Sequence, residues 1–489
     1  MSSTPKLRPT LAALISVGIA SLTHISTAEA LSVPEARHLL ARTGFGNASW
    51  TEIQRLLPLS RKQAVEHLLK STKQKTTLPP PGWALSAPTF RPPRGAAREE
   101  RRAFFRVRRQ EALTLIDWWV REMAATSSPL TERMTLFWHN HFTTSYRKVR
   151  APHLLYRQNL TLRRYALDNF RVLTHAMAQD AAMVIFLDNF RNRRGKPNEN
   201  FARELLELFT LGEGRYTERD VKEAARSFTG WAIDRNTGAF RFFSRRHDNG
   251  LKKFMGRRGR FNGDQIIEIV LKRPQVAVHI TQKAWRAFVS ESPNAGEVKI
   301  IAGRFRRSGY DIKALMRGLL LSRSFWLAKN RGRLIKSPLD LIVGTVRQFG
   351  VSPPSGRMLF RLTRALGQVP FMPPNVKGWP GGKRWITANT LLMRRQVLRA
   401  LLRRPAAVRN RKTKMGKMVK PGMAQQMMRG RMQPLDLDRW VRRGPSAYRN
   451  AQRVTQILLA IPPVQAPRAG TDPSRYVRAL LLDPAYQLK

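Results

Sequence analysis

The stretch from Lys196 to Trp231 constrains the fold more than any other part of this chain, because it encodes two amphipathic helices in succession. It reads KPNENFARELLELFTLGEGRYTERDVKEAARSFTGW. Asn198 suits a helix N-cap and Gly212 suits a helix end, and apolar side chains recur between them at helical spacing. A Thr-x-x-Asp capping box then starts a second amphipathic segment. We therefore expect helices at 199–211 and 217–229.

Helix signals also dominate the rest of the sequence. Two further capping boxes begin at Ser32 and Ser60. A β-hairpin is expected at 231–243, where Asn236-Thr237-Gly238 provides the turn. The predicted fold class is all-α, a large multi-helix body with one minor β-hairpin. Apolar spacing and caps predict other helices at 97–125, 129–142, 152–168, 264–272, 275–290, 311–322, 338–349, 387–402, 446–460 and 473–485.

The N-terminus has the pattern of a secretory signal peptide. Lys6 and Arg8 precede the apolar run from Leu11 to Ala20, and small residues then lead to Ala30. The apolar run is shorter than the roughly 20 residues of a membrane-spanning helix. We expect cleavage after Ala30 and a periplasmic or secreted protein, with an uncleaved anchor as the alternative. No later segment is long and apolar enough for a transmembrane helix.

The mature chain divides into three parts by composition. A helical domain is expected at 31–402, and a Pro-rich linker lies within it at 71–96. Residues 403–434 are basic, rich in methionine and without helical periodicity, which predicts a flexible segment. Methionine thioethers suit Cu(I), but a flexible loop that happens to contain methionine explains the segment equally well. Residues 435–489 are expected to form a short helical C-terminal region.

The charge of the chain points to an anionic partner. There are 89 Lys and Arg residues against 32 Asp and Glu, a net charge of +57. For an exported protein, such a field favours an acidic polysaccharide or an anionic envelope surface over nucleic acid. The alternative is that the proteins of the host are basic in general, so that the charge indicates no particular partner. The sequence has no cysteine, no Gly-rich phosphate loop, no GxSxG and no HExxH, which argues against several familiar catalytic classes.

The segment FWHNHF carries two histidines that a metal site could use. Ser128 and Pro129 begin the helix, and His141 then lies on the stripe of Leu130. His139 lies about 200° away from His141 around an ideal helix, so both can reach one metal only if the helix ends there. The alternative is a hydrogen-bonded core His141 and a His139 that lines a groove.

Two further groups of polar residues complete the candidate metal or substrate cluster. Glu204 and Glu207 lie one helical turn apart, where they could chelate a hard cation, share a proton or pair with arginines such as Arg203. In HDNGLKK, His247 and Asp248 lie at an expected tight turn and could reach a ligand from a loop. The cluster as a whole is His139, His141, Glu204, Glu207, His247 and Asp248.

Candidate contacts to an anion or a carbohydrate come from two loops. Lys252 and Lys253 follow the turn in HDNGLKK. The segment PPNVKGWPGGKRWI is too rich in Pro and Gly for regular structure. Its tryptophans could stack on sugar rings or form a buried plug between helices. The candidate contacts are Lys252, Lys253, Asn375, Lys377, Trp379 and Trp385.

Four motifs follow one another along the chain: FWHNHF, the stretch 196–231, HDNGLKK and PPNVKGWPGGKRWI. Together, in this order, they resemble a bacterial exported family catalogued as domain of unknown function 1800 (DUF1800), over roughly residues 33–402. The resemblance implies no particular reaction. It does imply a neighbouring gene for a second exported protein, which is a candidate partner. Many members are expected to carry His at the position of Phe209, and Phe can neither ligate a metal nor transfer a proton.

Three functional hypotheses follow. The favoured one is a non-catalytic envelope or extracellular-matrix protein that binds an acidic polymer or a partner protein. The second is a metal-assisted hydrolase or related enzyme that uses a divalent metal in the His and Glu cluster. The third is an exported nucleic-acid binder.

Overall fold

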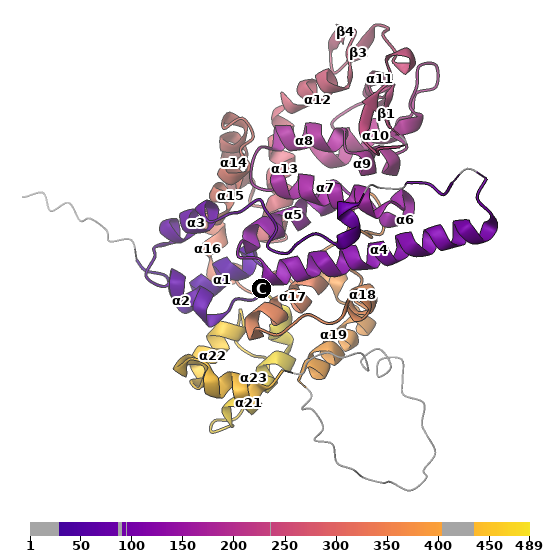
Figure 1. Ribbon diagram of the computed structural model, residues 1–489. Coiled ribbons are helices and arrows are strands. Elements are labelled where there is room, and N and C mark those ends of the chain that lie inside the picture. Colours follow the sequence, from indigo (N-terminus) through magenta and orange to yellow (C-terminus); the bar gives the residue numbers. More distant parts are fainter. Residues whose placement is uncertain (1–28, 87–89, 94, 235, 403–434) are drawn as a thin grey trace, which may run out of the picture.

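The computed structural model describes residues 29–86, 90–93, 95–234, 236–402 and 435–489. The predicted Met-rich segment and nearly all of the predicted signal peptide lie outside these ranges. The described part of the chain is predominantly helical, as the sequence predicts, and it contains two small antiparallel hairpins where the sequence predicted one (Figure 1). None of its helices combines the length and apolar character needed to cross a bilayer.

The largest apolar core lies between helices from the N-terminal two thirds of the chain. Helix α5 (Pro129–His141) contributes Met134 and Trp138 to it, and the interior side of α13 (Pro274–Phe288) contributes Trp285. The other helices around this core are α1 (Val33–Thr43), α2 (Trp50–Leu56), α3 (Arg61–Lys70), α8 (Phe170–Ala178), α10 (Asn200–Glu204), α11 (Glu218–Ser227), α12 (Gly263–Leu271), α14 (Ala295–Arg307), α15 (Ile312–Leu320) and α16 (Arg323–Trp326).

A second core joins the long helix α4 (Arg98–Ala125) to the other side of α5. A buried ion pair fixes this junction: the Arg163 guanidinium donates to the Glu132 carboxylate at 2.6 and 3.0 Å. The indole N–H of Trp119 donates to the same carboxylate at 2.9 Å. The remaining helices of this core are α6 (Tyr146–Val149), α7 (Pro152–Arg164), α9 (Ala181–Phe186), α17 (Pro338–Phe349), α18 (Gly356–Ala365) and α19 (Ala388–Leu401).

The C-terminal helices pack onto this body. Helices α21 (Leu437–Arg443), α22 (Ala451–Leu458) and α23 (Pro473–Leu482) form a third core with side chains of α17 and α19. In Figure 1 they gather at one end of the molecule, and the hairpins lie at the opposite end. The buried Lys336 donates to the backbone carbonyl of Tyr486 at 2.7 Å, which ties the end of the chain to the start of α17.

Residues 77–83 of the Pro-rich segment lie on α4. The buried Glu122 carboxylate accepts the backbone N–H groups of Thr77 and Leu78 at 2.8 and 2.7 Å. Trp83, in the short helix η1 (Gly82–Leu85), donates to the Thr114 hydroxyl at 2.8 Å. The extended backbone of this segment is therefore held by α4 side chains.

The predicted hairpin at 231–243 is present as β1 (Trp231–Ile233) and β2 (Phe240–Phe242), with Trp231 opposite Phe242. A second hairpin, β3 (Lys252–Phe254) and β4 (Arg257–Gly259), occupies the region where the sequence predicted only a turn. Its reversal uses Met255 and Gly256, both at positive φ. Three-residue strands are too short for an alternating pattern to stand out in the sequence.

Candidate functional site

The two histidines of FWHNHF point into different cores. His139 is 1 % exposed, and its ring packs against Trp119, Phe371 and Trp379. His141 is also buried, against Phe142 and Phe209. Burial lowers the pKa of His139 to about 3 and holds the pKa of His141 well below its ordinary value. Both imidazoles are therefore neutral structural groups, and the prediction that His139 lines a groove is wrong.

His139 has a defined structural role. Its Nε2 accepts the backbone N–H of Phe371 at 3.2 Å, and the Phe371 carbonyl accepts the N–H of Tyr146 at 2.8 Å. Phe371 has a φ of 61°, a conformation that costs energy for any side chain beyond glycine. The two hydrogen bonds hold this strained residue at the start of the loop that carries PPNVKGWPGGKRWI.

The predicted helix at 199–211 contains a π-helical segment, η3 (Leu205–Thr210). In a π-helix a backbone N–H bonds to the carbonyl five residues earlier, one more than in an α-helix. The Leu211 N–H donates to the Leu206 carbonyl in this way at 2.9 Å. The next carbonyls are satisfied by side chains. The Phe209 carbonyl accepts from His141 at 3.1 Å, and the Leu208 carbonyl accepts from Lys283 at 3.2 Å. The π-helix thus connects α5 with α13.

Glu204 directly precedes this segment and Glu207 lies within it. The Tyr216 hydroxyl donates to Glu207 at 2.7 Å, and the Lys377 ammonium lies 3.9 Å from the same carboxylate. Burial, and secondly the charge of Glu207, raise the pKa of Glu204. Arg203 pairs instead with Glu199 and Glu218.

The HDNGLKK segment lies next to α11. Asp248 pairs with Arg226 at 2.8 Å, and His247 contacts the Thr229 carbonyl at 2.9 Å. Lys252 is buried and donates to the Asp248 carbonyl at 2.6 Å, so it is not available to an anionic ligand. Lys253 is exposed on β3.

The six residues of the predicted cluster therefore occupy separate places. His139 and His141 lie in two cores, Glu204 and Glu207 lie at the start of the π-helix and within it, and His247 and Asp248 lie beside α11. Across the ranges that the structure describes, no group of three His, Cys, Asp or Glu side chains could hold a metal ion.

Asn140, between the two histidines, fixes the Gly- and Trp-rich loop. Its side-chain oxygen accepts the backbone N–H of Trp379 at 2.7 Å. Gly378 has a φ of 80°, and a Cβ there would lie 2.3 Å from the Asn140 oxygen, so only glycine allows this approach. The side-chain oxygen of Asn375 accepts the backbone N–H of Lys377 at 2.9 Å, which shapes the turn.

This loop closes one side of a cleft of about 550 Å³, which we call the basic cleft. One wall is the face of α5 at Arg133, Phe137 and Asn140, and the facing wall is α13. Seven cationic side chains and two carboxylates line it. The full lining is Arg133, Leu136, Phe137, Asn140, Lys283, Arg286, Ala287, Glu291, Leu334, Ile335, Ser337, Asp340, Gln368, Lys377, Trp379, Pro380, Gly381, Gly382, Lys383, Arg384, Trp385 and Lys489.

One of the two carboxylates is already neutralised. Asp340 is buried and pairs with Arg133 at 2.9 Å and with Lys489 at 2.6 Å. Burial alone would raise the pKa of Asp340, but these two cations outweigh it and hold the pKa well below its ordinary value. Burial, with the charge of Arg286, lowers the pKa of Lys283 to about 8. The cleft therefore favours a ligand that brings negative charge.

Trp379 and Trp385 are only 5 % and 7 % exposed. Their ring faces belong to the second core, so the prediction of an exposed stacking platform for sugars is wrong. They still contribute to the wall of the basic cleft, where they hold the loop that carries Lys383 and Arg384.

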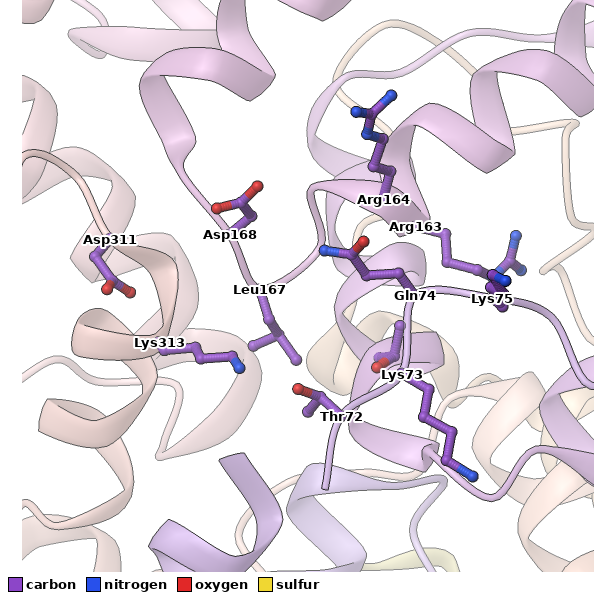
Figure 2. A pocket seen from close by; sticks show the side chains of 11 residues that line it. Thr72, Lys73, Gln74, Lys75, Arg163, Arg164, Leu167, Asp168, Asp311 and Lys313 are labelled. Atoms are coloured by element: carbon purple, nitrogen blue, oxygen red, sulfur yellow. The ribbon is translucent and has the colours of Figure 1, made fainter. Parts of the chain in front are cut away.

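A second pocket of about 520 Å³ lies where the segment after α3 passes α7 and the start of α15 (Figure 2). Figure 2 shows Asp311 and Lys313 on one side, with Gln74 and Arg164 on the other. Its carboxylates offset part of its positive charge, and Arg163 is already paired with Glu132. It is less suited to an anion than the basic cleft.

The sequence identified Asn375, Lys377, Trp379 and Trp385 near the basic cleft but missed most of its cations. Arg133, Lys283, Arg286, Lys383, Arg384 and Lys489 come from four distant parts of the chain. One signal was available: Arg133 and Asn140 lie at helical spacing beside Phe137, at the edge of the apolar stripe of α5.

The fold and the cleft define a strongly basic, predominantly helical protein with a cation-lined cleft. The chain belongs to the family described as "Protein of unknown function (DUF1800)", whose model matches residues 38–488. The match includes the C-terminal helices that pack onto the body. Comparisons with curated proteins and with solved structures find no match.

Proposed function

We propose that this protein is a non-catalytic binding protein of the cell envelope or extracellular matrix, and that its basic cleft holds a segment of an acidic polysaccharide. The observation that carries the proposal is the excess of cations in one cleft. Seven cationic side chains line it against two carboxylates, one of which already pairs with two of those cations.

Four of the cleft cations have no carboxylate partner in the described part of the chain: Lys283, Arg286, Lys383 and Arg384. The half-buried Lys283 bonds only to the Leu208 carbonyl. Lys377 lies 3.9 Å from Glu207 and is 67 % exposed, so it remains accessible. Carboxylates or sulfates of a polymer would supply the missing negative charges, and guanidinium groups would bind them in pairs of hydrogen bonds.

The size of the cleft and the net charge support the same ligand class. A volume of about 550 Å³ lies within the range of ordinary ligand sites, so the cleft accommodates a short segment of a chain. The net charge of +57 would attract a long polyanion to the rest of the surface. The cleft then supplies the site where the segment is held.

We also propose that the protein is exported, with its signal peptide removed after Ala30. The basic, apolar and small-residue order of residues 1–30 supports this. N-terminal sequencing of protein from the cell envelope should begin at Leu31. Envelope protein that begins at Met1 would show that the leader is retained.

The binding proposal is tested with two variants that remove equal charge. The cleft variant combines Arg286→Gln, Lys377→Gln, Lys383→Gln and Arg384→Gln. The control variant combines Lys299→Gln, Arg304→Gln, Arg307→Gln and Arg323→Gln, at exposed positions outside the basic cleft. With polygalacturonate as the probe, the cleft variant should lose about tenfold or more in affinity, and the control variant much less. Equal losses would mean that only net charge matters.

A further inference from the structure

The N-terminal half of α4 extends beyond the neighbouring helices, as Figure 1 shows at the end of α4 that joins the Pro-rich segment. From residue 98 to residue 110 it has no fully buried side chain, whereas Glu111 and Ala112 begin the part that packs into the body. The protruding half therefore contributes little to the core. Its surface is free to contact another molecule.

One face of this half carries four arginines around an aromatic ring. Arg98, Arg101, Arg102, Phe105 and Arg109 follow one another at intervals of three, one, three and four residues, which places them on one side of an α-helix. We call this face the α4 stripe. It spans roughly 16 Å at 1.5 Å per residue. All five side chains are exposed.

The arginines of the α4 stripe have no acidic partner in the ranges that the structure describes. The two acidic residues of this half lie outside the stripe, and Glu100 accepts the backbone N–H of Ala97 at 2.8 Å as part of the helix cap. Phe105 is 45 % exposed in the middle of the four cations. Among the residues that the structure describes, its one aromatic neighbour is Phe104, at 5.4 Å between ring centroids.

These features distinguish the α4 stripe from the basic cleft. The stripe is convex and straight, so a broad flat surface can contact its full length, whereas a single polymer strand would gain no enclosing wall. A soluble polyanion would also give the exposed phenyl ring of Phe105 no apolar environment. A lipid interface offers both a broad flat surface and an apolar environment. Its headgroup phosphates bind arginines, and an aromatic ring enters the acyl boundary.

We propose that the α4 stripe docks on an anionic lipid surface. Arg98, Arg101, Arg102 and Arg109 contact headgroup phosphates, and Phe105 inserts between the upper acyl segments. The charge complementarity of an unpaired cationic face and an anionic headgroup layer supports this partner. The stripe and the basic cleft are separate surfaces, so a protein docked in this way keeps its cleft available to a polymer.

The test uses the full mature chain and vesicles of phosphatidylglycerol or phosphatidylcholine in a sedimentation assay. The stripe variant combines Arg98→Gln, Arg101→Gln, Arg102→Gln and Arg109→Gln, which keeps good helix formers at exposed positions. It should lose about a hundredfold or more in affinity for phosphatidylglycerol vesicles. The control variant, which removes the same charge elsewhere, should lose far less. Wild type should bind phosphatidylcholine only weakly.

The single variant Phe105→Ser separates lipid insertion from ionic attraction. It should weaken binding to phosphatidylglycerol vesicles by about tenfold, because the buried ring is lost, and leave polygalacturonate binding unchanged. Equal losses in the stripe and control variants would overturn the proposal. So would an unchanged Phe105→Ser variant, or a stripe variant that loses polygalacturonate and vesicle binding to the same extent. Circular dichroism of each variant confirms that the helices remain.

Discussion

The side-chain oxygen of Asn140 accepts a 2.7 Å hydrogen bond from the backbone N–H of Trp379, two residues that are 239 positions apart in the chain. Helix α5 thereby positions the loop that supplies Lys377, Lys383 and Arg384 to the basic cleft. The approach requires Gly378, whose missing side chain leaves room for the Asn140 amide. The geometry of the cleft thus depends on one amide group at the end of α5.

Replacing this amide should weaken both the fold and the cleft. We expect Asn140→Ala to lower the free energy of unfolding by about 1–3 kcal/mol, because the buried N–H of Trp379 loses its acceptor. Affinity for polygalacturonate should fall as the loop cations lose their fixed positions. Urea unfolding and a binding titration measure the two effects. Asn375→Ala is the matched control on the same loop, and since its bond is local and exposed, a loss as large as that of Asn140→Ala would contradict this account.

Glu204 should destabilise the fold at neutral pH. Burial and the neighbouring Glu207 raise the pKa of Glu204 above its unfolded value, so its ionisation costs more in the folded state. Folding stability should therefore decrease as the pH rises from the unfolded pKa, about 4.3, through the raised folded pKa. Glu204→Gln should be more stable than wild type at neutral pH, with no such gain below about pH 4. Urea unfolding at several pH values measures this, and a variant less stable than wild type at neutral pH would show that the carboxylate is paired.

In contrast to ionised Glu204, protonated His175 should stabilise the fold. Its two ring nitrogens contact Asp264 at 3.0 Å and Glu268 at 2.9 Å, which joins α8 to α12, and Arg171 also pairs with Glu268. Burial lowers the pKa of His175, but the hydrogen bonds and charges of the two carboxylates outweigh it and raise the pKa overall.

A raised folded-state pKa means that the imidazolium stabilises the fold. This contribution is fully present below the unfolded pKa, about 6.5, and is lost as the pH rises through the folded value. His175→Gln should therefore be destabilised most below about pH 6, with a deficit that shrinks at higher pH. Thermal unfolding across this range measures the difference. A deficit independent of pH would indicate a packing role without titration.

The sequence predicted the helices whose ends carry strong signals. Ser128 with Pro129 marked the start of α5, and Thr217 with Asp220 marked α11, where both halves of the capping box form. It did not predict α8, α14 or α18. The π-helix also escaped prediction, because its carbonyls are satisfied by His141 and Lys283, which lie far away in the chain.

The candidate site was predicted only where its residues are close in sequence. The loop at 373–386 was identified from its Pro, Gly and Trp content, but its tryptophans are buried in the second core, where Trp379 packs against His139 of α5. Lys489 was missed because its place in the basic cleft depends on Asp340, which is 149 residues away. Local patterns carry no information on such pairings.

The central claim is that the basic cleft, rather than the overall charge, holds the acidic polymer. The most direct measurement is the salt dependence of polygalacturonate affinity in wild type, the cleft variant and the control variant. Because each cation bound to a linear polyanion releases condensed counterions, log K should fall linearly with log salt, with a slope of roughly one per contact. We expect the cleft variant to have a shallower slope than wild type by about three to four, and the control variant to keep the wild-type slope. If the cleft variant keeps the wild-type slope, the polymer does not bind in the basic cleft and the account is wrong.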